Sequence, residues 1–108
     1  MTFEQARQFA LSLPLTTEEP HHDMTSFRVK GRIFATAPQD GKHLHVFVYE
    51  NEADASIAED PKAFELLFWG KRYAGVRVNL KAAKVAHVKE LLESSWRRRA
   101  PKSALRSR

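Results

Sequence analysis

The residues of this sequence that could do chemistry are mainly basic and aromatic. The chain has 18 Lys and Arg residues against 13 Asp and Glu, and one residue in ten is aromatic. Cations beside aromatic rings suit a nucleic-acid strand, because the cations contact phosphates and the rings stack on bases. The chain has no cysteine, which excludes disulfides, thiolate metal sites and a cysteine nucleophile.

The positive charge is concentrated at the C-terminal end. Residues 97–108 contain six basic and no acidic residues, so the other 96 residues contain 12 basic and 13 acidic ones. Arg97, Arg98 and Arg99 fall on the last turn of an expected helix, where each cation interacts favourably with the helix dipole by about 0.3 to 1 kcal/mol. Successive helical residues are about 100° apart, so the three arginines cannot all face one phosphate surface.

The histidines and serines form no recognisable catalytic or metal-binding motif. His87 lies about two helical turns from Ser94 and Ser95, which is beyond hydrogen-bond reach. His43 and His45 project from the same side of an expected strand, and even with the His21–Asp23 stretch nearby they make only half a zinc or copper site. We therefore expect no catalytic residue, no metal site and no cofactor.

A glycine pattern from Gly70 to Gly75 has the spacing of a P-loop but not its chemistry. The Lys-Ser/Thr pair that follows the second glycine of a P-loop is missing, and a strand is expected next where a P-loop has a helix. The sequence does not support nucleotide hydrolysis.

Helices are expected at both ends of the chain. Thr2 and Gln5 form a capping box, and apolar residues recur at helical spacing until Pro14. A longer helix is expected to run to Ala100 with Trp96 in the core, since Pro101 excludes its continuation. Residues 15–25 have no sustained period and are expected to form a loop.

The middle of the chain has the period of β-strands. Residues 25–30 and 32–37 are expected to form a hairpin turning at Gly31-Arg32, although Phe34 is out of phase with its neighbours. Residues 43–50 form a third expected strand, and Gly75–Leu80 another, with Trp69 at the core edge and a further short strand possible at 67–69. Residues 51–67 are expected to form one or two short helices, broken at Asp60-Pro61.

This order predicts an α+β fold: a two-layer sandwich in which N- and C-terminal helices pack on one face of an antiparallel sheet. Residues 1–100 are expected to form a single domain, and residues 101–108 a basic, flexible tail with little to bury. The first residues lack the apolar core of a signal peptide, and no stretch reaches membrane-spanning length. We expect a cytoplasmic monomer that does not enter a membrane.

Several stretches resemble the MmcQ/YjbR-like family of small bacterial proteins. They are ALSLP, FRVKGRIFAT, DGKHLHV, AEDP, FWGKRYAGVRVNL and HVKELLESSWRRRAPK, which together extend from about Thr2 to Lys102. The resemblance implies a frataxin/CyaY-like fold and a DNA-binding role. The family often has a glycine where this chain has Leu15. Iron binding of the frataxin kind would need clustered carboxylates on the first helix, where only Glu4 is present.

The leading hypothesis is a non-enzymatic protein that binds nucleic acid, DNA in particular, through the sheet face not covered by helices, the hairpin turns and the C-terminal end. Phosphate contacts are expected from basic residues and base stacking from Phe47; the basic residues are Arg28, Lys30, Arg32, Lys42, Lys71, Arg72, Arg77, Arg97, Arg98 and Arg99. The alternative is an adaptor that binds a protein or a small ligand, with no nucleic-acid role.

Overall fold

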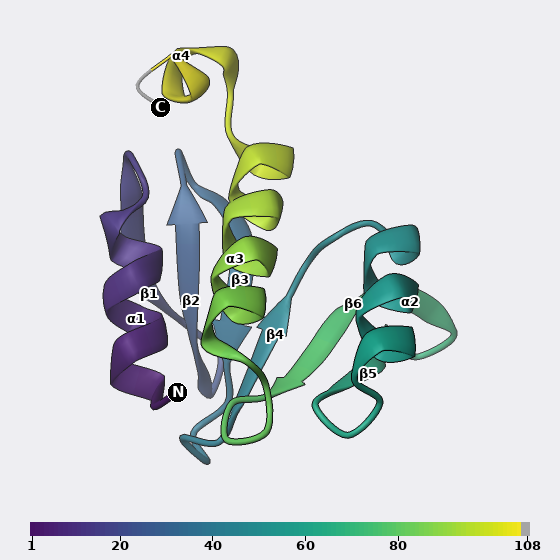
Figure 1. Ribbon diagram of the computed structural model, residues 1–108. Helices are drawn as coiled ribbons and strands as arrows, with labels where there is room; N and C mark the ends of the chain where they lie inside the picture. The colour runs from purple at the N-terminus through teal and green to yellow at the C-terminus, as the bar shows by residue number, and fades with distance from the viewer. Residues whose placement is uncertain (107–108) are drawn as a thin grey trace.

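The computed structural model describes residues 1–106, which form a six-stranded antiparallel sheet with helices on one face (Figure 1). The strands are β1 (Thr16–His21), β2 (Met24–Val29), β3 (Arg32–Ala37), β4 (His43–Val46), β5 (Phe64–Trp69) and β6 (Arg72–Asn79). The helices are α1 (Phe3–Ser12), α2 (Glu50–Glu59), α3 (Val85–Arg99) and α4 (Lys102–Leu105). The strand order is β1-β2-β3-β4-β6-β5. The predicted α+β class is confirmed.

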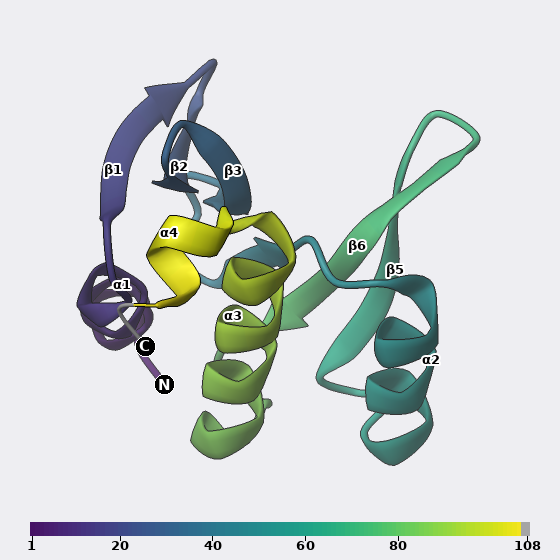
Figure 2. The same ribbon diagram turned by 90° about the horizontal axis from the view of Figure 1, so that it is seen from above.

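The helices form one layer over the sheet, as Figure 2 shows from above. The expected capping box starts α1: the Thr2 hydroxyl accepts from the Gln5 amide, and the Gln5 side chain accepts from the Thr2 amide. α3 ends before Pro101 as expected, with its arginines on the last turn. Between the two layers, the Trp96 side chain is fully buried, and its Nε1 donates to the Pro14 carbonyl oxygen at 3.0 Å. This indole therefore joins the two helices at the centre of the core.

One strand lies where a loop was expected. β1 occupies most of residues 15–25 and pairs with β2 through a tight turn at His22, which has a φ of 57°. Its sequence, TTEEPH, has no apolar alternation because β1 is an edge strand whose inward-facing Glu18 pairs with Arg7 of α1 at 2.7 Å. Pro20 is tolerated there because an edge strand leaves one row of backbone groups unpaired.

The β2–β3 hairpin is confirmed with two differences. Its two-residue turn is Lys30-Gly31, one residue earlier than expected, and both residues have positive φ (51° and 79°), as in a type I′ turn. The pairing of β2 with β3 shifts between Phe27 and Arg28, leaving Phe34 as an extra residue. This bulge explains why Phe34 is out of phase in the sequence and is nevertheless fully buried.

β5 and β6 form a long hairpin; the expected strand at 75–80 and the possible short strand at 67–69 are both part of it, and both strands begin earlier than expected. The turn is Gly70-Lys71, with the positive φ of Gly70 (64°) at its first position. Residues 64–67 are therefore extended and not helical, while the expected helix break at Asp60-Pro61 is confirmed. A β-carbon on Gly75 would meet the Val46 carbonyl oxygen at 2.3 Å, so only glycine allows β6 to pass β4 so closely.

Two connections at the ends of the helices carry further information. Leu15, which follows α1, has a φ of 59°, a conformation that glycine adopts more easily than leucine.

After Pro101 the chain forms α4, which lies between α1 and the end of α3 (Figure 2). Ala104 is fully buried there, whereas the sequence suggested little burial beyond Pro101. Residues 107 and 108 of the expected tail lie outside the described residues.

Candidate functional site

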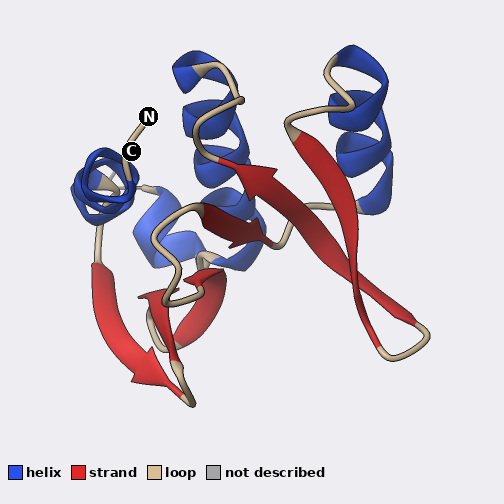
Figure 3. Ribbon diagram, turned by 90° about the horizontal axis from the view of Figure 1, so that it is seen from below, coloured by secondary structure: helices blue, strands red, loops and turns tan. Residues whose placement is uncertain are grey.

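The sheet opens at the end where β4 stops. β3 pairs with β4 only through Ala35–Val46 and Thr36–His45, and β4 leaves the sheet after Val46. Beyond that point β3 and β6 have no strand between them, and the β5–β6 hairpin diverges from β1–β3, as Figure 3 shows from below. The C-terminal end of α3 lies at this opening.

Arginines from three elements meet at the opening. The Arg98 guanidinium donates to the Phe47 carbonyl oxygen at 3.0 Å and lies 4.1 Å from the centre of the Tyr49 ring. Arg32, the first residue of β3, donates to the Arg99 carbonyl oxygen at 3.4 Å. Arg72, the first residue of β6, lines the same hollow as Arg98 and Arg99. The divergence of the strands therefore brings together basic residues that are up to 67 positions apart.

Two adjoining hollows lie among these arginines. One, of about 350 Å³, is lined by His21, Gly31, Arg32, Ile33, Thr36, Phe47, Trp69 and Arg99. The other, of about 270 Å³, is lined by Phe47, Trp69, Arg72, Tyr73, Ala74, Arg98 and Arg99. None of the described residues that line the two hollows is acidic. We refer to the two hollows together, with Trp69 and the four arginines Arg32, Arg72, Arg98 and Arg99, as the arginine groove.

The four arginines of the groove have no acidic partner in the described part of the chain. Within residues 1–106, none of them forms an ion pair with a carboxylate. The Nε of Arg99 is buried and has no hydrogen-bond partner among these residues. Burial, followed by the neighbouring positive charges of Arg98 and Arg32, lowers the pKa of Arg99. A bound anion would offset this repulsion.

The aromatic surface of the groove is Trp69 and not Phe47. Trp69 was expected at the core edge, but its side chain is 60% exposed. Phe47 is only 3% exposed and packs edge-on against Trp69, with 5.3 Å between the ring centres. The expectation that Phe47 offers an open stacking surface is therefore wrong: β4 ends at Val46, so strand alternation no longer decides where the Phe47 ring points.

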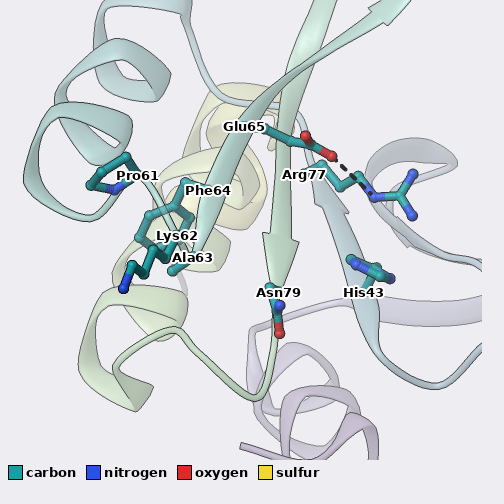
Figure 4. Close-up of a pocket in the computed structure, with 8 residues that line it drawn as sticks. All are labelled: His43, Pro61, Lys62, Ala63, Phe64, Glu65, Arg77 and Asn79. Carbon is teal, nitrogen blue, oxygen red and sulfur yellow. Dashed lines mark ion pairs between the residues drawn. The ribbon is translucent and has the colours of Figure 1, made fainter.

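The basic residues of the uncovered sheet face have acidic partners. The Arg28 guanidinium donates to the Ser26 hydroxyl and lies 3.9 Å from a carboxylate oxygen of Glu19. Arg77 lies 3.5 Å from a carboxylate oxygen of Glu65, beside a third hollow of about 220 Å³ (Figure 4). The expected cationic sheet face is thus neutralised by the protein's own side chains.

The remaining basic residues predicted to contact phosphates lie in the hairpin turns, before β4 and on α3. Lys30 and Lys71 are exposed in the two hairpin turns that flank the groove. Lys42 precedes β4, at the end of that strand away from the groove. Arg97 points elsewhere and pairs with Glu93 at 3.2 Å on the surface of α3. The structure therefore groups six of the ten predicted cations and leaves four outside.

The histidines of β4 interact with neighbours in the sheet. The His43 ring lies 2.7 Å from the Asp40 carboxylate, and backbone amides of the turn, Lys42 first, lower the pKa of Asp40 to about 2. His45 contacts the Thr36 hydroxyl at 3.3 Å, and burial lowers its pKa. No group of three or more His, Cys, Asp or Glu side chains within residues 1–106 is arranged to hold a metal ion.

A Ser-His-Glu arrangement that sequence spacing did not suggest lies between α2 and α3. His87 Nε2 is 2.9 Å from the Ser56 hydroxyl, and its Nδ1 is 3.6 Å from a carboxylate oxygen of Glu59. Ser56 is buried in mid-helix, and its hydroxyl also contacts the Glu52 carbonyl oxygen at 3.1 Å. A nucleophilic serine must be open to a substrate, whereas this buried contact links the two helices.

One signal in the sequence could have located the groove. The stretch FWGKRY places Gly-Lys between two extended runs, which is typical of a two-residue hairpin turn. Recognising it would have put Trp69 and Arg72 opposite each other, where the structure pairs them. The contribution of Arg32 depends on its contact with α3, for which the sequence carries no local signal.

Comparison with known proteins identifies a sequence family. The sequence model of the family described as YjbR matches residues 11–98. No curated protein sequence matches the chain closely enough to show a relationship. Over the described residues, none of the helices has the length and apolar character needed to cross a membrane.

Proposed function

The chain belongs to the YjbR family, and we propose that it binds nucleic acid through the arginine groove. The observation that carries this proposal is that four arginines surround an exposed tryptophan without any carboxylate lining the hollows. Arginine is well suited to phosphate because its planar guanidinium offers two parallel donors. We therefore propose the arginine groove as the binding surface, in place of the uncovered sheet face that the sequence analysis favoured.

Each part of the proposed interface has a separate task. Arg32, Arg72, Arg98 and Arg99 contact phosphates, while Lys30 and Lys71 on the flanking turns add attraction that does not depend on base sequence. Trp69 offers a ring to a base. As in the sequence analysis, we propose that the protein is cytoplasmic, monomeric and non-enzymatic. A chain without cysteine fits the reducing conditions of the cytoplasm.

A titration with matched variants tests the proposal. A labelled single-stranded DNA of about 12 nucleotides is titrated at about 50 mM and about 200 mM salt, and affinity is read from fluorescence anisotropy. The double variant R98Q/R99Q is expected to bind about tenfold more weakly at low salt and to show a shallower salt dependence, because phosphate contacts are lost.

The control is R97Q, which removes the same kind of charge from the same helical turn but outside the groove. It is expected to change affinity less than twofold. If R97Q reduced DNA affinity as much per charge removed as R98Q/R99Q, binding would depend on the net charge of the protein and not on the groove.

The alternative function is that of an adaptor which holds a protein or a small ligand. The larger hollow, about 350 Å³, lies within the range of small-molecule pockets, which supports this second candidate. If the unaltered protein bound neither single-stranded nor duplex DNA at low salt, the nucleic-acid proposal would be rejected in favour of the adaptor.

A further inference from the structure

The larger hollow of the arginine groove combines two kinds of lining. Ile33, Phe47 and Trp69 provide apolar and aromatic surface, while Arg32 and Arg99 provide positive charge. A nucleotide has the same division between a flat base and a charged phosphate. The lining therefore matches one nucleotide unit more closely than it matches an inorganic anion or an apolar ligand.

The positive charge on this side of the hollow is not neutralised by the described residues. No carboxylate among them pairs with the guanidinium of Arg99 or of Arg32, and the Nε of Arg99 is buried. Arg32 is held close to Arg99 through the Arg99 carbonyl oxygen. Two guanidiniums on one hollow can share the oxygens of one phosphate, and such charge-assisted bonds are stronger than neutral ones.

The aromatic side of the hollow is held in place. The Trp69 ring rests edge-on against the buried Phe47 ring, and the next residue, Gly70, begins the tight turn of the β5–β6 hairpin. Thr36 and His21 also line the hollow and offer polar groups to the edge of a base. An ordered aromatic platform loses little entropy when a base stacks on it.

Resting on the proposed function, we infer that the hollow beside Trp69 holds one unpaired nucleotide of a single strand, with its base on Trp69 and its phosphate at Arg32 and Arg99. In a duplex each base is already stacked on its neighbours and paired, so its face can stack on the Trp69 ring only if the base leaves the helix, which costs free energy. The ligand class is therefore single-stranded nucleic acid.

The test compares W69A, W69F and F68A on single-stranded and duplex DNA of the same sequence. Phe68 is the matched control: it is the adjacent exposed aromatic residue, but it lines neither hollow. For the single strand we expect W69A to bind about tenfold more weakly, W69F to recover most of that loss, and F68A to change affinity less than twofold. Duplex binding should change less than twofold in all three variants.

Tryptophan fluorescence gives an independent readout, because Trp69 is exposed and the only other tryptophan, Trp96, is fully buried. Single-stranded DNA should protect the emission of the protein from a soluble quencher, and W69F should lose this protection. Adenosine monophosphate and inorganic phosphate are tested as separate probes.

Each contrary outcome has a distinct meaning. If W69A weakened single-strand and duplex binding equally, the nucleotide subsite would be rejected while nucleic-acid binding remained. If adenosine monophosphate bound and protected Trp69 but no DNA did, both would be rejected in favour of a free-nucleotide site. If only inorganic phosphate bound, the base would have no part and the subsite would again be rejected.

Discussion

Two sets of arginines in this molecule differ in whether they have acidic partners. On the uncovered sheet face, Arg28 and Arg77 lie close to Glu19 and Glu65. In the arginine groove, the four arginines have no carboxylate partner within residues 1–106. A strand within a regular sheet presents opposing side chains to its neighbours, and Glu65 is the cross-strand partner of Arg77. In the groove, Arg32 and Arg72 are opposite Val29 and Trp69 in their strand pairs, and neither of these residues is acidic, so the positive charge remains available.

The largest expected effect comes from displacing β6, the strand that borders the arginine groove. G75A would place a methyl group against the Val46 carbonyl oxygen and the Phe47 backbone, so β6 would have to move. We expect the free energy of unfolding, measured by urea denaturation, to fall by about 3 kcal/mol.

G41A is the comparison variant for this experiment. Its new β-carbon would meet no atom within 4 Å, and only its φ of 68° is unfavourable. We expect a loss of about 1 kcal/mol. Equal losses in G41A and G75A would show that the close approach of β6 to β4 does not depend on the missing side chain of Gly75.

The second prediction removes the same charge from each set. R32Q/R72Q in the groove should weaken binding to single-stranded DNA about tenfold at low salt, and R28Q/R77Q on the sheet face less than threefold. The slope of affinity against salt should fall by about two for the groove variant and stay unchanged for the other. Equal effects would mean that the acidic partners on the sheet face do not mask its arginines.

The third prediction concerns the contact that joins β6 to the segment after β4. The Tyr73 hydroxyl donates to the Val48 carbonyl oxygen at 2.6 Å, and Y73F should lower the free energy of unfolding by about 1 kcal/mol at pH 7. Burial raises the pKa of Tyr73 from 10.0 to about 12. Between these values the unfolded chain loses the proton before the folded one, so stability from this group is complete below pH 10 and lost as the pH rises through 12.

Unfolding measured at several alkaline pH values checks this sign. The difference in stability between the unaltered protein and Y73F should shrink from pH 10 to pH 12. A difference that grew over this range would contradict the assigned cause of the pKa shift.

The smallest expected effect lies outside both sets of arginines. Leu15 has a φ of 59°, which is a strained conformation for leucine. L15G should raise the free energy of unfolding by about 0.5 kcal/mol, because the relief of strain exceeds the conformational entropy that glycine adds to the unfolded chain. DNA affinity should not change. A rise in affinity in L15G, together with the rise in stability, would show that binding follows global stability, and the comparison of the two arginine sets would then need correction for stability.

The sequence predicted the elements that have their own periodic pattern. The first and last helices, the β2–β3 hairpin and the helix break at Asp60-Pro61 all depend on local spacing, and they are confirmed. β1 was missed because its residues bury little apolar surface and its register comes from pairing with β2. Its inward-facing Glu18 is matched by Arg7 from another element, which no local pattern records.

The site was less predictable than the fold, because it depends on where a strand ends. Alternation along residues 43–50 correctly placed Val46 and Val48 in the core but made Phe47 an exposed partner for bases. The chain leaves the sheet at that point, and the adjacent hairpin covers the Phe47 ring with Trp69. The sequence lists the basic residues, but only the tertiary contacts show which of them have acidic partners and which do not.

The polar contacts between α2 and α3 have a consequence for local unfolding. α2 fully buries only Ala53 and Ser56, and its polar links to α3 include the Ser56–His87 and Glu52–Ser94 hydrogen bonds and the Glu59–His87 ion pair. Small side chains and a few polar links contribute little to the free energy that opposes opening. The backbone amides of α2 should therefore exchange with deuterium well before those of α3, which makes this helix the part of the protein that detaches first while the rest stays folded.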